Sequence, residues 1–281
     1  MTFSEIKHKI KNLGEFKSLE EIKKAGLRIV RNTKTSDYWL IEEEFLKPVV
    51  KSLKECESIL IKGENLRYRV LMVNKSKEEL KRKKILDYIE WGEESGVHKI
   101  ESVKNRKRWY ELPIQSPGNF IFSMTYGDRY LTPINENYLI DAAIYNVYIK
   151  QKFLNYKNWL KVFFNSSIFP LLVELYSRIM TGALPLAQMK VYEWYPVDLI
   201  LFELNSRKEI IIARPIKSIF AELGFDPNKP IREQKPNPLP DRKALDDIVF
   251  DALGLTEEER KEVYWAVAEL VQNRLKKAKS F

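Results

Sequence analysis

The chain has 281 residues, of which 44% are hydrophobic, and a formal net charge of +9 at pH 7. This length and apolar content suffice for a sizeable core, arranged as one large domain or two smaller ones. The single cysteine, Cys56, excludes an internal disulfide and fits a reducing cytoplasm. No apolar run approaches the roughly 18 residues of a membrane span, and Met1 to Leu13 has no signal-peptide core. We therefore expect a cytoplasmic protein.

Positive charge is concentrated in the N-terminal part of the chain. Residues 1–110 carry 26 Lys and Arg against 18 Asp and Glu, whereas residues 111–281 carry 22 against 21. A polyanion such as nucleic acid is the natural partner of this field, although an anionic membrane surface fits the charge alone. Few Gln, one Cys and many Lys, Glu, Ile and Tyr are also typical of thermophile proteins.

Motifs for cofactor chemistry are absent from the sequence. No G-x-G pair and no phosphate loop ending in Gly-Lys-Ser/Thr occurs, so we expect no nucleotide or S-adenosylmethionine site here. One cysteine and two histidines cannot assemble a Cys/His zinc site, and neither His8 nor His98 lies in a context that fits a catalytic triad.

Two segments resemble catalytic motifs without completing them. Asn237-Pro238-Leu239-Pro240 is similar to the Asn-Pro-Pro-aromatic tetrad of amino-methyltransferases but lacks the aromatic residue that stacks on a flipped base. We interpret it as part of a Pro-rich loop. Asp198 with Glu203-Leu204-Asn205 resembles a nuclease metal site, but the Lys expected two residues after the Glu is missing.

The N-terminal half predicts a β-rich region over residues 1–150. Capping-box spacings at Thr2–Glu5 and Ser18–Glu21 predict short helices, and Ser76 opens a basic helix toward Trp91. Apolar runs between polar or Gly/Pro segments predict strands at 27–30, 38–41, 59–61, 68–73, 109–112, 120–124, 130–132 and 138–142. These short runs favour a mixed or antiparallel sheet.

The second half is more helical. Segments 159–164 and 169–180 are apolar on most sides and predict core helices, 189–194 and 199–204 predict strands, and 216–223 predicts a short helix. Residues 151–226 thus form a second α/β part, and five prolines in 227–240 predict a linker. A two-helix tail follows, ending at residue 281. The overall prediction is an α+β fold.

The last helix begins at a cap on Thr256, and Lys276, Lys277 and Lys279 complement its C-terminal dipole. An apolar stripe runs along it at Val263, Val267, Leu270, Val271 and Leu275. This stripe docks either on the chain itself or on a partner.

The densest cationic segment is Lys104-Asn105-Arg106-Lys107-Arg108, followed by Trp109-Tyr110-Glu111-Leu112. Lys and Arg neutralise phosphates and release counterions, Arg also reads guanine in bidentate fashion, and aromatic rings stack on bases. The segment predicts a loop that grips a nucleic-acid backbone at the rim of a sheet. The alternative is a solvated basic turn. Because Trp109 begins a predicted strand, core packing is favoured over base stacking.

Two further loops carry candidate DNA-binding residues. Arg31, Asn32, Lys34 and Thr35 lie between two predicted strands and suit phosphates or base edges, with an ordinary polar hairpin as the alternative. Tyr126 and Arg129 flank Gly127 and would reach a groove, with a surface turn as the alternative.

Several of these segments, in order, resemble the specificity region of Taq-type adenine DNA methyltransferases. Residues 26–40 are similar to that family's strand, polar "G-x-x-T-G"-like loop and aromatic strand, with Asn32 and Ser36 where glycines usually stand. Residues 102–112 resemble its basic segment. The other similar segments are 122–129, Phe164-Asn165-Ser166-Ser167, Thr181-Gly182-Ala183-Leu184, 189–193, Pro196-Val197 and 250–255.

The resemblance spans roughly residues 26–280 but lacks the family's catalytic half. It implies a target-recognition module of a restriction–modification enzyme that grips double-stranded DNA. A separate catalytic methyltransferase chain or domain would bind S-adenosylmethionine and flip adenine. The resemblance also places Lys190 and Tyr192 in a second recognition half, with core packing as the alternative for Tyr192. A nuclease or other enzyme with an unrecognised site, and a structural scaffold, are the competing function classes.

Overall fold

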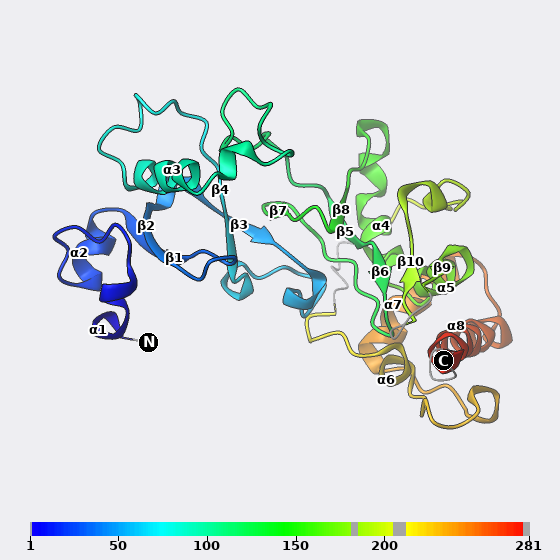
Figure 1. Ribbon diagram of the computed structural model, residues 1–281. Helices are drawn as coiled ribbons and strands as arrows, with labels where there is room; N and C mark the ends of the chain where they lie inside the picture. Colours follow the sequence, from blue (N-terminus) through cyan, green and yellow to red (C-terminus); the bar gives the residue numbers. More distant parts are fainter. Residues whose placement is uncertain (1, 181–184, 205–211, 278–281) are drawn as a thin grey trace. The chain divides into compact units, whose positions relative to one another are not determined.

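The computed structural model describes residues 2–180, 185–204 and 212–277. The chain divides into two compact units: unit 1 comprises residues 1–49 and 68–116, and unit 2 comprises residues 50–67 and 117–281. The motif segment 181–184 with Gly182, together with Asn205 and Lys279, lies outside the described residues. Short antiparallel strands and helices occur in both units, which confirms the predicted α+β class (Figure 1).

Unit 1 is built from two strand pairs and one longer helix. Its elements are α1 (Phe3–Ile6), η1 (Lys7–Lys9), α2 (Leu19–Lys24), β1 (Leu27–Arg31), β2 (Tyr38–Glu42), η2 (Glu43–Phe45), β3 (Leu46–Val50), β4 (Tyr68–Leu71), α3 (Lys84–Glu94) and η5 (Val97–Lys99). β1 pairs antiparallel with β2 from Leu27↔Glu42 to Arg31↔Tyr38, and β3 pairs antiparallel with β4. Strands β1, β2 and β4 and both capped helices confirm the predictions for this stretch, whereas β3 was not predicted. The helix expected from Ser76 begins only at Lys84.

Helix α3 packs on β2 and depends on that strand for its N-terminal cap (Figure 1). Its own N-cap residue, Lys83, provides no side-chain cap, so the first amide groups need another acceptor. The buried carboxylate of Glu42 accepts the amides of Lys84 and Ile85 at 2.6 and 3.1 Å. This contact joins a carboxylate to the positive end of the helix dipole and orients α3 on the hairpin.

Unit 2 carries the larger core. Its elements are η3 (Leu53–Glu55), η4 (Gly63–Asn65), β5 (Phe120–Ser123), β6 (Thr125–Tyr126), β7 (Leu139–Ile140), β8 (Ile144–Val147), η6 (Gln151–Tyr156), α4 (Lys157–Phe163), α5 (Ile168–Tyr176), β9 (Arg178–Ile179), β10 (Ala187–Gln188), η7 (Val191–Trp194), α6 (Ile219–Leu223), η8 (Ile231–Glu233), α7 (Pro240–Ala252) and α8 (Glu257–Lys277). β5 pairs with β8, and β10 pairs with both β6 and β9, all antiparallel.

The last helix docks on its own chain, which decides between the two alternatives for its apolar stripe. α8 packs against α5, and Val267 and Val271 are fully buried in the same core as the β5–β8 pair. Near its end, the buried Arg274 donates from Nε and Nη2 to the two carboxylate oxygens of Glu174, each at 2.9 Å. A bidentate, desolvated pair of this kind fixes the helix in one register.

The two compact units divide the chain at other places than the predicted linker and domain boundaries. Residues 227–240 pack on α8: Ile231 is buried, Trp265 Nε1 donates to the carbonyl of Gln234 at 2.7 Å, and Gln272 Nε2 donates to the carbonyl of Pro227 at 2.8 Å. Because α4 to α8 share one core with β5 and β8, no boundary falls at residue 150 or 226.

Several predicted strands are irregular backbone satisfied by side chains. The expected strand at 130–132 is replaced by a side-chain clamp, in which Asn165 accepts the amide of Thr132 at 3.2 Å and donates to its carbonyl at 3.0 Å. In the expected strand at 199–204, Trp159 Nε1 donates to the carbonyl of Ile200 at 2.8 Å. An amide or indole group thus takes the place of a neighbouring strand. Segments 59–61, 109–112 and 189–194 are not strands either.

No helix within the described ranges combines the length and the apolar character that crossing a membrane requires.

Candidate nucleic-acid interface

The β1–β2 hairpin presents its polar loop in a defined conformation. The Asn32 side-chain oxygen accepts the amides of Lys34 and Thr35 at 2.8 and 3.1 Å, and the backbone of Asn32 bonds to Ser36 and Asp37. Ser36 has a φ of 68°, the left-handed region that glycine prefers and in which the similar family loop usually has glycine. Lys34 and Thr35 are consequently exposed on a closed turn rather than on a mobile loop.

Asn32 itself is occupied within the protein. Its oxygen holds the turn, and its nitrogen donates to the hydroxyl of Tyr88 on α3 at 2.7 Å. Both acceptor positions of the Asn32 oxygen and one of its two N–H donors are thus used within the protein. Arg31 is exposed, and its Nη2 donates to the Ser36 hydroxyl at 2.7 Å.

The basic segment is an anchored turn and not the beginning of a strand. Arg108 donates from Nε to Glu111 Oε2 at 2.9 Å and from Nη2 to the carbonyl of Asn74, and its Nη2 also forms an ion pair with Glu111 Oε2 at 2.8 Å. Arg106 Nη1 donates to the backbone carbonyl of Glu111 at 3.2 Å. Arg108 therefore helps to hold the turn, while the guanidinium of Arg106 and the ammonium of Lys107 are exposed to solvent.

Lys104, at the beginning of the run, is exposed and forms an ion pair with Glu101 at 2.6 Å. An exposed pair of this kind is screened by solvent and contributes little to stability, so a phosphate can replace Glu101 at small cost.

Two aromatic residues fasten the basic segment to the rest of unit 1. Trp109 Nε1 donates to Glu93 Oε1 at 3.1 Å, and Tyr110 donates to the carbonyl of Lys75 at 3.0 Å. The Trp109 ring lies directly over Gly92, where a Cβ atom would come within 2.5 Å of it. Trp109 is thus packed against the protein, as favoured for it over base stacking, although the reason is contact with α3 and not a strand.

Helix α3 brings the two predicted loops together. Tyr88, which holds the hairpin loop, and Gly92, which receives Trp109, are one helical turn apart, roughly 6 Å along the axis. Unit 1 as a whole carries 22 Lys and Arg against 16 Asp and Glu, an excess of six of the total +9. Neighbouring turns of α3 therefore contact both loops, each of which carries exposed cations. The supporting residues Tyr88, Gly92 and Glu111 had no signal in the sequence beyond the i, i+4 spacing of the first two.

Two candidate DNA-binding residues in unit 2 have their side chains buried or hydrogen-bonded within the protein. Tyr126 is 2% exposed and its ring stacks on Tyr130, so the expected groove contact is corrected to a core position. Arg129 donates to the carbonyls of Leu53, Cys56, Glu57 and Ile216, which occupies the guanidinium within the protein.

Lys190 is exposed, and its backbone amide donates to Glu193 at the beginning of η7. The neighbouring Tyr192 is 45% exposed and lies 5.0 Å below the guanidinium of Arg178. Of the unit 2 candidates, Lys190 keeps a side chain that is available at the surface.

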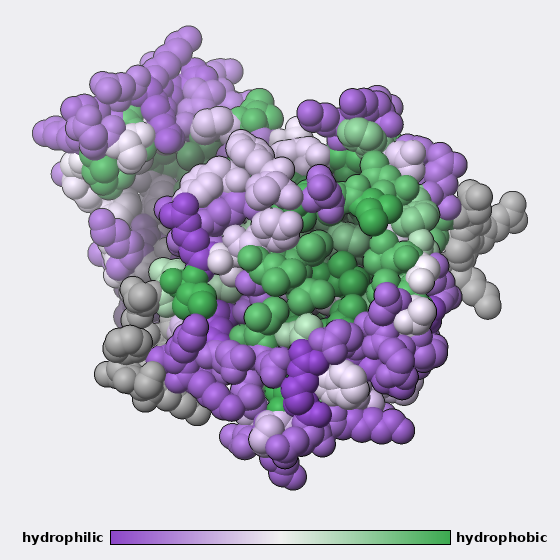
Figure 2. Space-filling model, turned by 90° about the vertical axis from the view of Figure 1, so that its right-hand side faces the viewer, coloured by the Kyte–Doolittle hydropathy of each residue, from purple (hydrophilic) through white to green (hydrophobic). Residues whose placement is uncertain are grey.

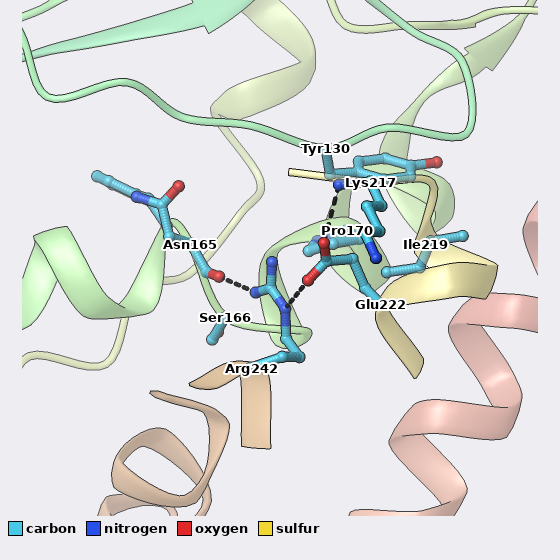
Figure 3. Close-up of a pocket in the computed structure, with 9 residues that line it drawn as sticks. Tyr130, Asn165, Ser166, Pro170, Lys217, Ile219, Glu222 and Arg242 are labelled. Atoms are coloured by element: carbon cyan, nitrogen blue, oxygen red, sulfur yellow. Dashed lines mark hydrogen bonds and ion pairs between the residues drawn. The ribbon is translucent and has the colours of Figure 1, made fainter. Parts of the chain in front are cut away.

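A cluster of charged side chains inside unit 2 is structural. Arg242 lies between the carboxylate of Glu222 and the backbone carbonyl of Asn165 (Figure 3). Glu222 also forms an ion pair with Arg214. Burial raises the pKa of Glu222, but the hydrogen bond from Arg214 and the charge of Arg242 outweigh it and lower the pKa overall. The opposite charges in this pocket are paired with one another, and removal of one partner would leave a buried charge uncompensated.

The segment similar to the family's "L-N-S-S" motif contributes to the same region. Ser167 donates from its amide and its hydroxyl to the buried carboxylate of Asp246 at 2.6 and 2.7 Å, which ties α5 to α7. This motif therefore maintains the core.

The residues of the incomplete nuclease motif do not converge. Asp198 and Glu203 are both exposed, and Glu203 accepts a hydrogen bond from Asn155 at 2.7 Å. Among the described residues, no group of three or more His, Cys, Asp or Glu side chains is arranged to hold a metal ion.

Comparison with known families identifies the context of this surface. The sequence model of one family, described as "Type II methyltransferase M.Eco57I, C-terminal domain", matches residues 30–184, more than half of the chain. The chain belongs to this family. No curated protein and no solved structure matches it.

The match places the chain in the context of a restriction–modification methyltransferase. The matched stretch begins within β1 and includes the hairpin loop, α3 and the basic segment. Lys190 lies beyond its end. Both loops on α3 are thus features of the family domain of this chain.

Proposed function

We propose that this chain is the target-recognition module of an adenine-N6 DNA methyltransferase in a restriction–modification system. In this role it binds double-stranded DNA in the cytoplasm and reads a short sequence. A separate catalytic methyltransferase chain or domain binds S-adenosylmethionine and transfers the methyl group. The module by itself has no catalytic activity.

The observation that carries the proposal is the convergence of two cationic loops on α3. Phosphate contacts position a protein on the duplex, and side chains beside them reach base edges. Arg106 and Lys107 on one loop and Arg31 and Lys34 on the other offer four exposed cations on backbones that are held by hydrogen bonds. Such pre-organisation supports reading of a sequence, because little ordering entropy is lost on binding.

A second observation supports a protein partner. Large apolar side chains of unit 2 are exposed, including Leu175 at 61%, Val191 at 52%, Tyr195 at 79% and Ile200 at 54%. Figure 2 shows an apolar area bordered by hydrophilic side chains on one face of the molecule. Areas of this kind mark interaction surfaces, and the catalytic chain or domain is the partner that the proposal requires.

The proposal is tested by selection from a random-duplex DNA library with the full chain at moderate salt, followed by sequencing of the retained duplexes. Enrichment of a short motif that contains adenine is the expected result. Salt-sensitive retention without a motif would mean that the chain grips only the backbone, and would overturn sequence reading. Cleavage of the duplexes in the presence of Mg²⁺ would assign the chain to the nucleases instead.

A further inference from the structure

We infer that Tyr88 is a positioning residue for DNA recognition, because it holds the hairpin turn that carries Arg31 and Lys34 in its binding conformation. The inference rests on the proposed function and adds a residue that does not itself touch DNA.

The amide side chain of Asn32 adds to the backbone hydrogen bonds that close the turn, and Tyr88 helps to hold that side chain. Asn32 closes the turn only when its oxygen points toward the amides of Lys34 and Thr35. The amides of Lys34 and Thr35 orient the Asn32 oxygen toward the turn, and the 2.7 Å hydrogen bond from the Asn32 nitrogen to the Tyr88 hydroxyl holds the other end of the same amide. Without the hydroxyl, the Asn32 side chain loses one of these three hydrogen bonds, and the turn is held less firmly.

Tyr88 is itself rigidly placed. Its ring packs edge-on against the buried Trp39, with the ring centroids 5.1 Å apart. It also packs at a tilt against Trp91, with the ring centroids 5.3 Å apart. Burial also raises the pKa of Tyr88, so the phenol stays protonated and neutral over the working pH range. The ring contacts and the hydroxyl contact are separable, because Tyr88→Phe removes only the hydroxyl.

The same arrangement links the hairpin turn to the basic segment. Trp109 packs on Gly92, one turn further along α3 than Tyr88. The Asn32–Tyr88 bond therefore helps to fix the spacing at which a DNA backbone that contacts Arg106 and Lys107 meets Lys34. Loss of the bond weakens binding without removing any cation.

The test compares Tyr88→Phe with Lys34→Ala in the full chain, using the duplex selected above and a salt titration. Lys34→Ala should lower affinity and reduce the slope of log K against log salt by about 0.9, the amount for one phosphate contact. Tyr88→Phe should lower affinity by about two- to tenfold, the range of one hydrogen bond, with the slope unchanged. Hydrogen–deuterium exchange should rise at residues 33–36 in Tyr88→Phe alone.

Tyr130→Phe is the matched control, because it removes a hydrogen-bonded hydroxyl in unit 2 and should affect stability but not affinity. Unchanged affinity in Tyr88→Phe, while Lys34→Ala binds more weakly, would overturn the inference and leave the proposed function standing. Unchanged affinity in both variants would remove the hairpin turn from the interface. Absence of DNA binding by the wild-type chain would overturn both proposals.

Discussion

Removal of two exposed cations from the basic segment, by Arg106→Ala together with Lys107→Ala, should weaken DNA binding in a salt-dependent manner. The structure selects this pair over Arg108, whose guanidinium is held by Glu111 and by the carbonyl of Asn74. Arg106 donates only one hydrogen bond to a backbone carbonyl at 3.2 Å, and Lys107 is exposed. Both are therefore available to replace counterions on phosphates.

The expected magnitude follows from counterion release. Each phosphate contact contributes about 0.9 to the slope of log K against log salt, so the double variant should lose about 1.8. If the wild-type and variant chains bind equally well at 1 M salt, this difference in slope makes the variant bind roughly 30-fold more weakly at about 0.15 M salt. The loss corresponds to about 2 kcal/mol of binding free energy. At higher salt the difference between the wild-type and variant chains should become smaller.

The assay is a fluorescence-anisotropy titration with the selected duplex at several salt concentrations, with circular dichroism to verify folding. Lys229→Ala with Lys235→Ala is the control, since it removes the same charge from exposed positions in unit 2. If both pairs reduce the slope equally, only net charge matters and the basic segment is not a specific contact. An unchanged slope in a folded Arg106/Lys107 variant would refute the reasoning.

Three further perturbations test what stabilises the two units and what places Trp109. Asn12→Ala should destabilise unit 1 by roughly 2–4 kcal/mol in urea unfolding, because it leaves the amide and carbonyl of the fully buried Leu40 unpaired; a loss below 1 kcal/mol would contradict this account. Burial raises the pKa of Asp246 from 3.8 to about 6, so its folded form binds a proton more tightly than its unfolded form, and unfolding free energy should fall by up to roughly 3 kcal/mol as the pH rises from about 4 to 7. Asp246→Asn should remove this part of the pH dependence, and identical pH profiles would show that Asp246 titrates normally. Gly92→Ala should displace Trp109, since the new Cβ atom would lie 2.5 Å from its ring, and should lower both thermal stability and DNA affinity; an unshifted Trp fluorescence spectrum would argue against the displacement.

Local sequence rules predicted much of unit 1. Strands β1 and β2, the caps of α1 and α2, and the cationic character of both loops depend on residues close in the sequence, so their patterns are readable without a fold. The capped last helix was readable for the same reason, because Thr256 and Glu259 bond to each other across three residues.

The roles of individual site residues depended on partners far away in the chain. Asn32 bonds to Tyr88, 56 residues later, and Arg129 bonds to carbonyls more than 70 residues away. A polar side chain in a loop reads as a surface contact until such a partner is known. The same applies to Tyr126, whose burial depends on β10 and α5 packing around it.

The sequence by itself determined the α+β class, the basic N-terminal part and the two cationic loops, because charge and short-range hydrogen bonding are properties of neighbouring residues. The tertiary structure alone decided that α3 contacts both loops, that Asn32 and Arg129 are hydrogen-bonded within the protein, that Tyr126 is buried, and that residues 227–240 pack on α8. Those outcomes arise from desolvation and hydrogen-bond completion between distant segments, which only the folded chain brings into contact.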